Sequence, residues 1–125
     1  MAALQIVWFK RDLRIVDHRP LAAAAERGLV LPLYVVEPEL WRQPDASERQ
    51  WMFCRESLLD LRQALADRGQ PLVVRTGDVV QVLERARRQF GIEGLWSHEE
   101  TGNGWTYQRD TVSYTHLTLP TICSV

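Results

Sequence analysis

The feature that most constrains the fold is the alternation of short β-rich runs with longer helical patterns before residue 110. The first run, Leu4 to Phe9 (LQIVWF), is almost continuously apolar, as expected for a strand that helices cover on both faces. Three further runs predict strands at Leu33 to Val36, Leu72 to Val74 and Leu95 to Ser97. This alternation is typical of βαβ units, so we predict an α/β fold: a doubly wound, Rossmann-like parallel sheet in an incomplete three-layer α/β/α arrangement.

The first two helical patterns have recognisable ends. Asp17 is the predicted cap of a helix that continues through LAAAAER and stops at Gly28. Ser47 and Gln50 form the S-x-x-Q pair of a capping box, and apolar residues then recur at spacings of three and four until Gly69. Both patterns therefore predict helices that connect neighbouring strands.

A third helix is predicted between the third and fourth strands. Asp78 is its predicted cap, and Gly91 follows its last apolar position. The apolar stripe consists of Val79, Leu83, Ala86 and Phe90.

If the strands take the common order 3-2-1-4, ligands should bind beyond their carboxyl ends, where the strand order reverses. The segments to inspect are KRDLRIVDH after the first strand, EPELWRQPD after the second, TGD after the third and HEETGNGWTYQRD after the fourth. With this strand order, the first and fourth of these segments flank the crevice. A dinucleotide site would require G-x-G-x-x-G after the first strand. Because that turn reads KRDLR, the sequence disfavours a stand-alone nucleotide-binding module.

Composition narrows the function classes. The net charge is -1 and the arginines are dispersed among acidic residues, so no basic stripe predicts nucleic-acid binding by these residues alone. The two cysteines indicate neither a disulfide framework nor a metal site. No apolar run approaches the roughly 20 residues that cross a bilayer, and no signal peptide is recognisable, so we expect a cytoplasmic location.

The sequence changes character after Asp110. All Lys, Arg, Asp and Glu residues lie in 1–110, whereas 111–125, TVSYTHLTLPTICSV, contains none of them. One interpretation is a further β-strand, because VSYTHLTL alternates and is rich in β-formers. The favoured interpretation is a non-native tail, because VSYTHLTLPT resembles the translation of a transposon-end adapter used in sequencing libraries. We therefore predict one domain, 1–110, and exclude the tail from the fold argument.

The stretch VWFKRDLRIVDHRPL closely resembles the opening of DNA photolyases and cryptochromes, which typically reads W-F-R-x-D-L-R, followed by Asp and an alanine-rich helix. The resemblance continues through the helix of Glu56 to Gly69, where Leu61 and Leu65 are in register. It also includes PLVVRTGD and SHEETGNGWTYQRD, and so covers about residues 4 to 110.

The resemblance implies an amino-terminal α/β domain that holds an antenna chromophore, either a folate (methenyltetrahydrofolate) or a deazaflavin. In such proteins a helical domain holds FAD and binds damaged DNA, and reduced flavin repairs a pyrimidine dimer flipped out of the duplex. The leading hypothesis is therefore the antenna domain of a deoxyribodipyrimidine photolyase, and the alternative is that of a cryptochrome photoreceptor without repair activity. The chain contains none of the flavin-binding sequence. We expect it neither to bind FAD nor to repair DNA alone, and expect the helical FAD domain to be its partner and its route to DNA.

Three residues are candidate antenna contacts. Trp41 follows the second strand, and its indole could stack on a flat heterocycle, whereas Trp51 begins an apolar stripe and is at least as well explained by core packing. Glu99 and Glu100 follow the fourth strand, and the resemblance implies an acidic contact to the pterin of a folate at this loop. The alternative for this pair is a solvated loop.

Arg11, Asp12 and Arg14 form a charged cluster directly after the first strand. They are either a polar wall of the crevice or, as we favour, an arrangement that orders the loop and docks it on the helical domain, because guanidinium–carboxylate pairs fix loops well. His18 and His98 have no metal-like partners in the sequence, and neither is assigned a role.

Overall fold

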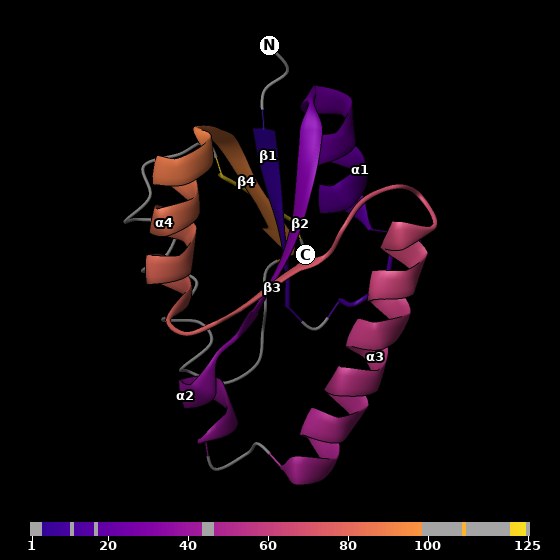
Figure 1. Cartoon of the computed structure of the whole chain (residues 1–125), viewed down its shortest axis with the longest axis vertical. Coiled ribbons are helices and arrows are strands. Elements are labelled where there is room, and N and C mark those ends of the chain that lie inside the picture. Colours follow the sequence, from indigo (N-terminus) through magenta and orange to yellow (C-terminus); the bar gives the residue numbers. More distant parts are fainter. Residues whose placement is uncertain are drawn as a thin grey trace.

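The computed structural model describes residues 4–10, 12–16, 18–43, 47–98, 109 and 121–124. These residues form one parallel sheet with strand order β3-β2-β1-β4-β5 (Figure 1). The strands are β1 (Leu4–Phe9), β2 (Leu29–Val36), β3 (Val73–Thr76), β4 (Ile92–His98) and β5 (Thr121–Ser124). The helices are α1 (Arg19–Arg27), α2 (Pro38–Trp41), α3 (Glu48–Ala66) and α4 (Val79–Phe90). The predicted α/β fold is confirmed, and the first four strands take the order 3-2-1-4 that was assumed for the placement of the crevice.

Helices cover both faces of the sheet, with α1 and α3 on one side and α4 on the other (Figure 1). Successive side chains of a strand point to opposite faces, so β1 contributes to two cores. Ile6 and Trp8 pack with residues of α4, whereas Val7 and Phe9 pack with residues of α1 and α3. The apolar run of β1 is therefore explained by burial on both sides.

β2 is longer than the sequence predicts. It begins at Leu29 rather than Leu33, and Pro32 lies inside it instead of introducing it. The pairing of β2 with β3 starts only at Leu33, which lies opposite Val73, so on that side Pro32 faces no described strand. Because proline has no amide hydrogen to donate to a neighbouring strand, it is tolerated at such an open edge.

The predicted cap of α1 is wrong. Asp17 lies outside the described residues, and the N-cap is His18, whose Nδ1 accepts a 3.1 Å hydrogen bond from the amide of Leu21. The predicted capping box of α3 is confirmed. Ser47 Oγ accepts from the Gln50 amide at 3.1 Å, and Gln50 Oε1 accepts from the Ser47 amide at 2.9 Å.

Both predicted ends of α4 are confirmed. Asp78 Oδ1 accepts from the amides of Val80 and Gln81 at 2.9 and 3.2 Å. Gly91 ends the helix with φ 64, a left-handed conformation that glycine adopts at little cost. The predicted apolar stripe is one residue too long, because Phe90 is 53% exposed.

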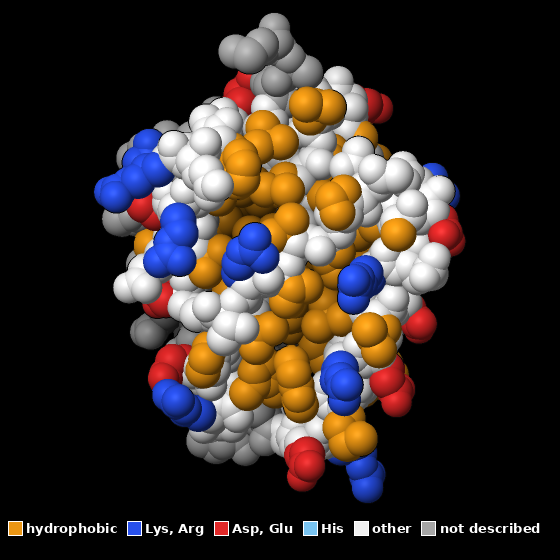
Figure 2. All heavy atoms as spheres, in the orientation of Figure 1, with side chains coloured by type: hydrophobic (Ala, Val, Ile, Leu, Met, Phe, Trp, Pro, Cys, Tyr) orange, Lys and Arg blue, Asp and Glu red, His pale blue; other side chains and the backbone are white. Residues whose placement is uncertain are grey.

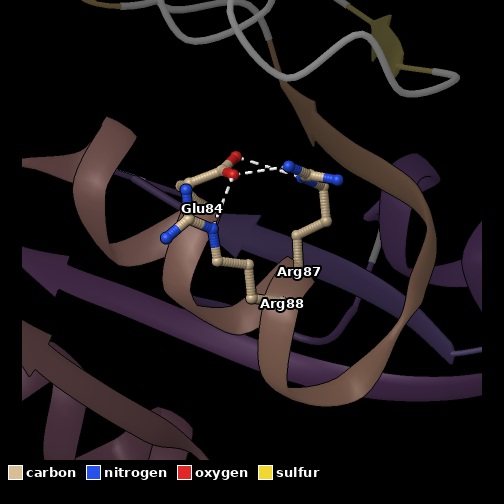
Figure 3. Close-up of polar contacts among 3 residues, drawn as sticks. All are labelled: Glu84, Arg87 and Arg88. Carbon is tan, nitrogen blue, oxygen red and sulfur yellow. Dashed lines mark hydrogen bonds and ion pairs between the residues drawn. The ribbon is translucent and has the colours of Figure 1, made fainter.

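The outer face of α4 carries a charged group of three residues, Glu84, Arg87 and Arg88 (Figure 3). Arg87 Nε donates to Glu84 Oε2 at 3.0 Å, and Arg88 Nε donates to Glu84 Oε1 at 3.2 Å. Arg87 Nη2 also donates to Glu84 Oε1. Hydrogen bonding and the charge of Arg87 lower the pKa of Glu84. The two arginines also lie in the last turns, where positive charge complements the helix dipole.

Residues Thr121–Ser124 lie beside β4, with Leu95 opposite Thr121 and Trp96 opposite Ile122. This pairing shows where the segment lies, but it does not show whether the segment belongs to the native protein. The domain boundary at residue 110 and the non-native tail therefore stay predictions. Within the described part of the chain, no helix combines the length and the apolar character needed to cross a membrane.

Candidate site at the carboxyl edge of the sheet

The strand order reverses between β1 and β4: β2 and β3 lie on one side of β1, whereas β4 and β5 lie on the other. In such sheets ligands bind beyond the carboxyl ends of the strands at this point. The carboxyl ends of β1 and β2 lie at the end of the molecule where α2 follows β2 (Figure 1). Polar side chains that follow these strands are therefore the candidates for function.

Asp12 organises the loop after β1. Its Oδ1 accepts a 2.9 Å hydrogen bond from the Lys10 amide, and its backbone oxygen accepts from the Arg14 amide at 2.8 Å. Its Oδ2 lies 2.5 Å from His18 Nε2. Arg11 lies outside the described residues. Whether Arg11, Asp12 and Arg14 serve loop order, domain docking or ligand binding stays a prediction.

His18 joins this loop to α1, a role that the sequence did not suggest. It is buried, and its ring packs against Phe9 with centroids 4.9 Å apart. Because Nδ1 accepts from the helix, the proton of a neutral imidazole resides on Nε2, the nitrogen that faces Asp12. Asp17 is the commoner cap type by residue preference, which is why sequence reasoning chose the wrong residue.

A buried charged cluster lies on the α4 side of the carboxyl edge. Trp8 is 1% exposed, and both Lys10 Nζ and Arg109 Cζ approach its ring, at 4.3 and 5.0 Å from the centroid. Arg109 Nε donates to Glu37 Oε2 at 2.9 Å. Glu37 follows β2 directly, so this ion pair connects the end of that strand to a residue 72 positions later. We refer to Trp8, Lys10, Glu37 and Arg109 as the Trp8 cluster.

The sequence patterns do not predict this cluster. The side chains of Glu37 and Arg109 are each only 6% exposed, and charged side chains are rarely so buried unless they are paired. The one local signal was the position of Glu37 immediately after a buried strand. Nothing in the sequence pairs it with Arg109.

Trp41, a predicted antenna contact, lies in α2 at the carboxyl end of β2. Its ring meets that of Trp51 edge to face, with centroids 5.1 Å apart and planes at 67°. Both residues are half-buried. The Nε1 of Trp41 is buried and donates to no described residue. A buried donor usually has an acceptor, but none lies among the described residues, so the role of Trp41 as an antenna contact stays a prediction.

The other predicted antenna contacts, Glu99 and Glu100, lie outside the described residues. Their roles stay predictions. Among the residues that the structure describes, no three His, Cys, Asp or Glu side chains are grouped so that they could hold a metal ion.

Comparison with known proteins places these features in a family. The DNA photolyase family model matches residues 5–115. A curated relative, the chloroplastic/mitochondrial Cryptochrome DASH of Arabidopsis thaliana, is 32% identical over 103 residues. That match covers 77% of this chain and 18% of the relative.

Solved structures of photolyases are similar to this chain as well. A class III photolyase from Agrobacterium tumefaciens has a TM-score of 0.87 at 25% identity, covering 99% of this chain and 26% of its own. An archaeal photolyase from Sulfolobus tokodaii, solved with two FAD molecules and implicating a novel light-harvesting cofactor, has a TM-score of 0.84 at 25% identity. The match covers 97% of this chain and 29% of the archaeal protein. The chain thus spans less than a third of each of these proteins. It belongs to the DNA photolyase and cryptochrome family, and it corresponds to the amino-terminal α/β domain of that family.

Proposed function

We propose that the chain is the antenna-chromophore-binding α/β domain of a deoxyribodipyrimidine photolyase. The proposal is supported mainly by the match of the DNA photolyase family model to residues 5–115. Trp41, whose buried Nε1 has no described acceptor, lies at the carboxyl end of β2 and is the candidate contact. The family supplies the context, since the similar archaeal photolyase is described with a light-harvesting cofactor. The chromophore would be a folate such as methenyltetrahydrofolate or a deazaflavin.

In this proposal Trp41 orients the chromophore by donating a hydrogen bond to a ring carbonyl, and Glu99 and Glu100 are further contacts. FAD and the damaged DNA would be bound by the helical domain of the full-length protein. No described residue is assigned to either of them.

The test is retention of chromophore by the purified chain. Methenyltetrahydrofolate and a deazaflavin are mixed separately with the protein, free ligand is removed by gel filtration, and near-ultraviolet and blue absorbance are recorded. We expect one chromophore to be retained in about equimolar amount. Trp41→Phe should reduce retention, whereas Glu39→Gln, an exposed change on the same helix, should not. If the wild-type chain retains neither chromophore, the proposal is wrong.

A cryptochrome is the second candidate, because the Arabidopsis relative carries that name. Both classes would share this domain, so chromophore binding does not separate them. The separating experiment is light-dependent repair of thymine-dimer DNA by the full-length protein that carries the domain. Repair supports the photolyase, and its absence in a flavin-loaded protein supports the cryptochrome.

The helical FAD domain is also the proposed partner of an apolar surface. Apolar side chains gather over β3 and between α3 and α4 (Figure 2), and β3 is the last described strand on its side of the sheet. On α3, the large apolar side chains of Met52, Phe53 and Leu59 are more than half exposed. Exposed apolar surface of this kind is typical of contact sites. Most of each similar protein lies beyond the matched part, which supports the remainder of the protein as the occupant.

A further inference from the structure

Glu37 lies between β2 and α2, and both its backbone and its side chain make contacts there. Its backbone oxygen accepts hydrogen bonds from the amides of Leu40 and Trp41, at 3.0 and 3.4 Å. Its carboxylate pairs with Arg109. The residue that starts the helix of Trp41 is thus held by a residue from a distant part of the chain.

The start of α2 has little support of its own. The helix spans only Pro38–Trp41, and Glu37 at its N-cap makes no side-chain capping hydrogen bond. An N-cap side chain usually accepts from the first amides of its own helix. Here the carboxylate is directed to Arg109 instead, so this short helix begins at a residue that a distant arginine contacts.

Trp8 and Glu37 fix that guanidinium from two directions. Arg109 Cζ lies 5.0 Å from the centroid of the buried Trp8 ring, and Nε donates to Glu37 Oε2 at 2.9 Å. A planar guanidinium can satisfy a carboxylate and an aromatic face together, whereas an ammonium group lacks this fork geometry. Because Trp8 belongs to the core strand β1, Arg109 links that strand to the residue that follows β2.

We propose that Arg109 is a positioning residue for the chromophore site. It holds Glu37, which holds the first turn of α2, and this turn sets the direction of the Trp41 Nε1–H. The inference rests on the proposed function, because it assigns Trp41 to the chromophore. It gives the buried ion pair of Glu37 and Arg109 a role at this edge.

The test compares Arg109→Gln, Arg109→Lys and Glu37→Gln in the full chain of 125 residues. Folding is checked by far-ultraviolet circular dichroism, the Trp41 indole N–H is followed by two-dimensional nitrogen–proton NMR, and Trp41→Phe assigns its signal among the five tryptophans. Methenyltetrahydrofolate and a deazaflavin are then titrated to obtain Kd. Arg87→Gln is the matched control, because Arg87 also pairs with a glutamate but lies on the exposed face of α4.

We expect Arg109→Gln and Glu37→Gln to shift the Trp41 signal and to raise Kd about tenfold or more, with Arg109→Lys between them and wild type. Arg87→Gln should change neither. Folded variants that keep the wild-type Trp41 signal and Kd would overturn the inference and leave the proposed function standing, because Arg109 would then serve stability alone. If wild type binds neither chromophore, the proposed function fails and this inference fails with it.

Discussion

The indole Nε1 of Trp96 donates a 2.7 Å hydrogen bond to Oε1 of Gln5, inside the core between the sheet and helices α1 and α3. Gln5 is 1% exposed, and its cross-strand partner in β4 is Gly94. A Cβ at Gly94 would lie 2.5 Å from Gln5 Oε1 and 3.0 Å from Trp96 Nε1. The glycine therefore makes room for this buried hydrogen bond.

Gly94→Ala should destabilise the fold by about 1–3 kcal/mol, the usual cost of overpacking a core. Urea denaturation measures the free energy of unfolding. In a Gln5→Ala background the same substitution should cost much less, because the first clashing atom is gone. Equal costs in the two backgrounds would show that Gln5 is not the obstacle.

His18→Ala should lower the free energy of unfolding by about 1–2 kcal/mol, because it removes the cap of α1. His18→Asn keeps an N-cap acceptor and should recover part of the loss. The recovery should be incomplete, since asparagine does not reproduce the ring packing on Phe9. If both substitutions lowered the free energy of unfolding equally, capping would be ruled out as the main contribution of His18 to stability.

The pair of Glu84 with Arg87 gives stability a pH dependence. Hydrogen bonding and charge lower the pKa of Glu84 in the folded state, so its contribution is complete above the ordinary glutamate pKa of about 4.3. It is lost as pH falls through the lowered folded pKa. The stability difference between wild type and Glu84→Gln should therefore be larger at pH 7 than at pH 3, and smaller in high salt.

Arg85→Gln is the control for this measurement, because Arg85 is an exposed arginine on the same helix. The difference in free energy of unfolding between Arg85→Gln and wild type should change less when the pH is lowered. A Glu84→Gln difference that does not shrink on acidification would contradict the assigned pKa direction.

Cys54 should react slowly with thiol reagents. Burial raises its pKa, and the hydroxyl of Tyr34, 3.2 Å from Sγ, lowers it in part. Because the thiolate is the reactive form, Tyr34→Phe should raise the pKa further and slow the reaction at neutral pH. The rate is measured with Ellman's reagent in a Cys123→Ser background. Faster reaction in folded Tyr34→Phe protein would mean that access, not ionisation, limits the rate.

The apolar residues on α3 should make the chain self-associate when the proposed helical partner is absent. Phe53 is 71% exposed, and burying such a side chain is worth roughly 1.5–3 kcal/mol. Phe53→Ser should therefore raise the dissociation constant in sedimentation experiments by about tenfold or more. Arg55→Ser is the control on the same helix. A wild-type chain that is monomeric and cooperatively folded would contradict this surface assignment.

Local patterns predicted most elements of the fold. The limits of β1 are correct because LQIVWF is buried on both faces, and the ends of α4 are correct because Asp78 and Gly91 act locally. The start of β2 was missed because a proline normally marks a strand boundary. Only the late start of the pairing with β3 makes Pro32 acceptable inside the strand.

The site was less predictable because its contacts are long-range. Trp41 was identified by its place after a strand, but its buried Nε1 depends on tertiary packing. The contact of Glu37 with Arg109 spans 72 positions and follows no periodicity. The sequence motifs therefore predict the edge of the sheet but not the ion pair of Glu37 and Arg109 that is buried there.

Hydrogen–deuterium exchange with and without saturating chromophore tests the proposed antenna site, because it locates the ligand on the sheet. We expect slower exchange at the carboxyl edge, in residues 12–16 and 40–43, and no change at the opposite edge around Gly28 and Gln70. Protection confined to that opposite edge, or no protection at all with either methenyltetrahydrofolate or a deazaflavin, would contradict it.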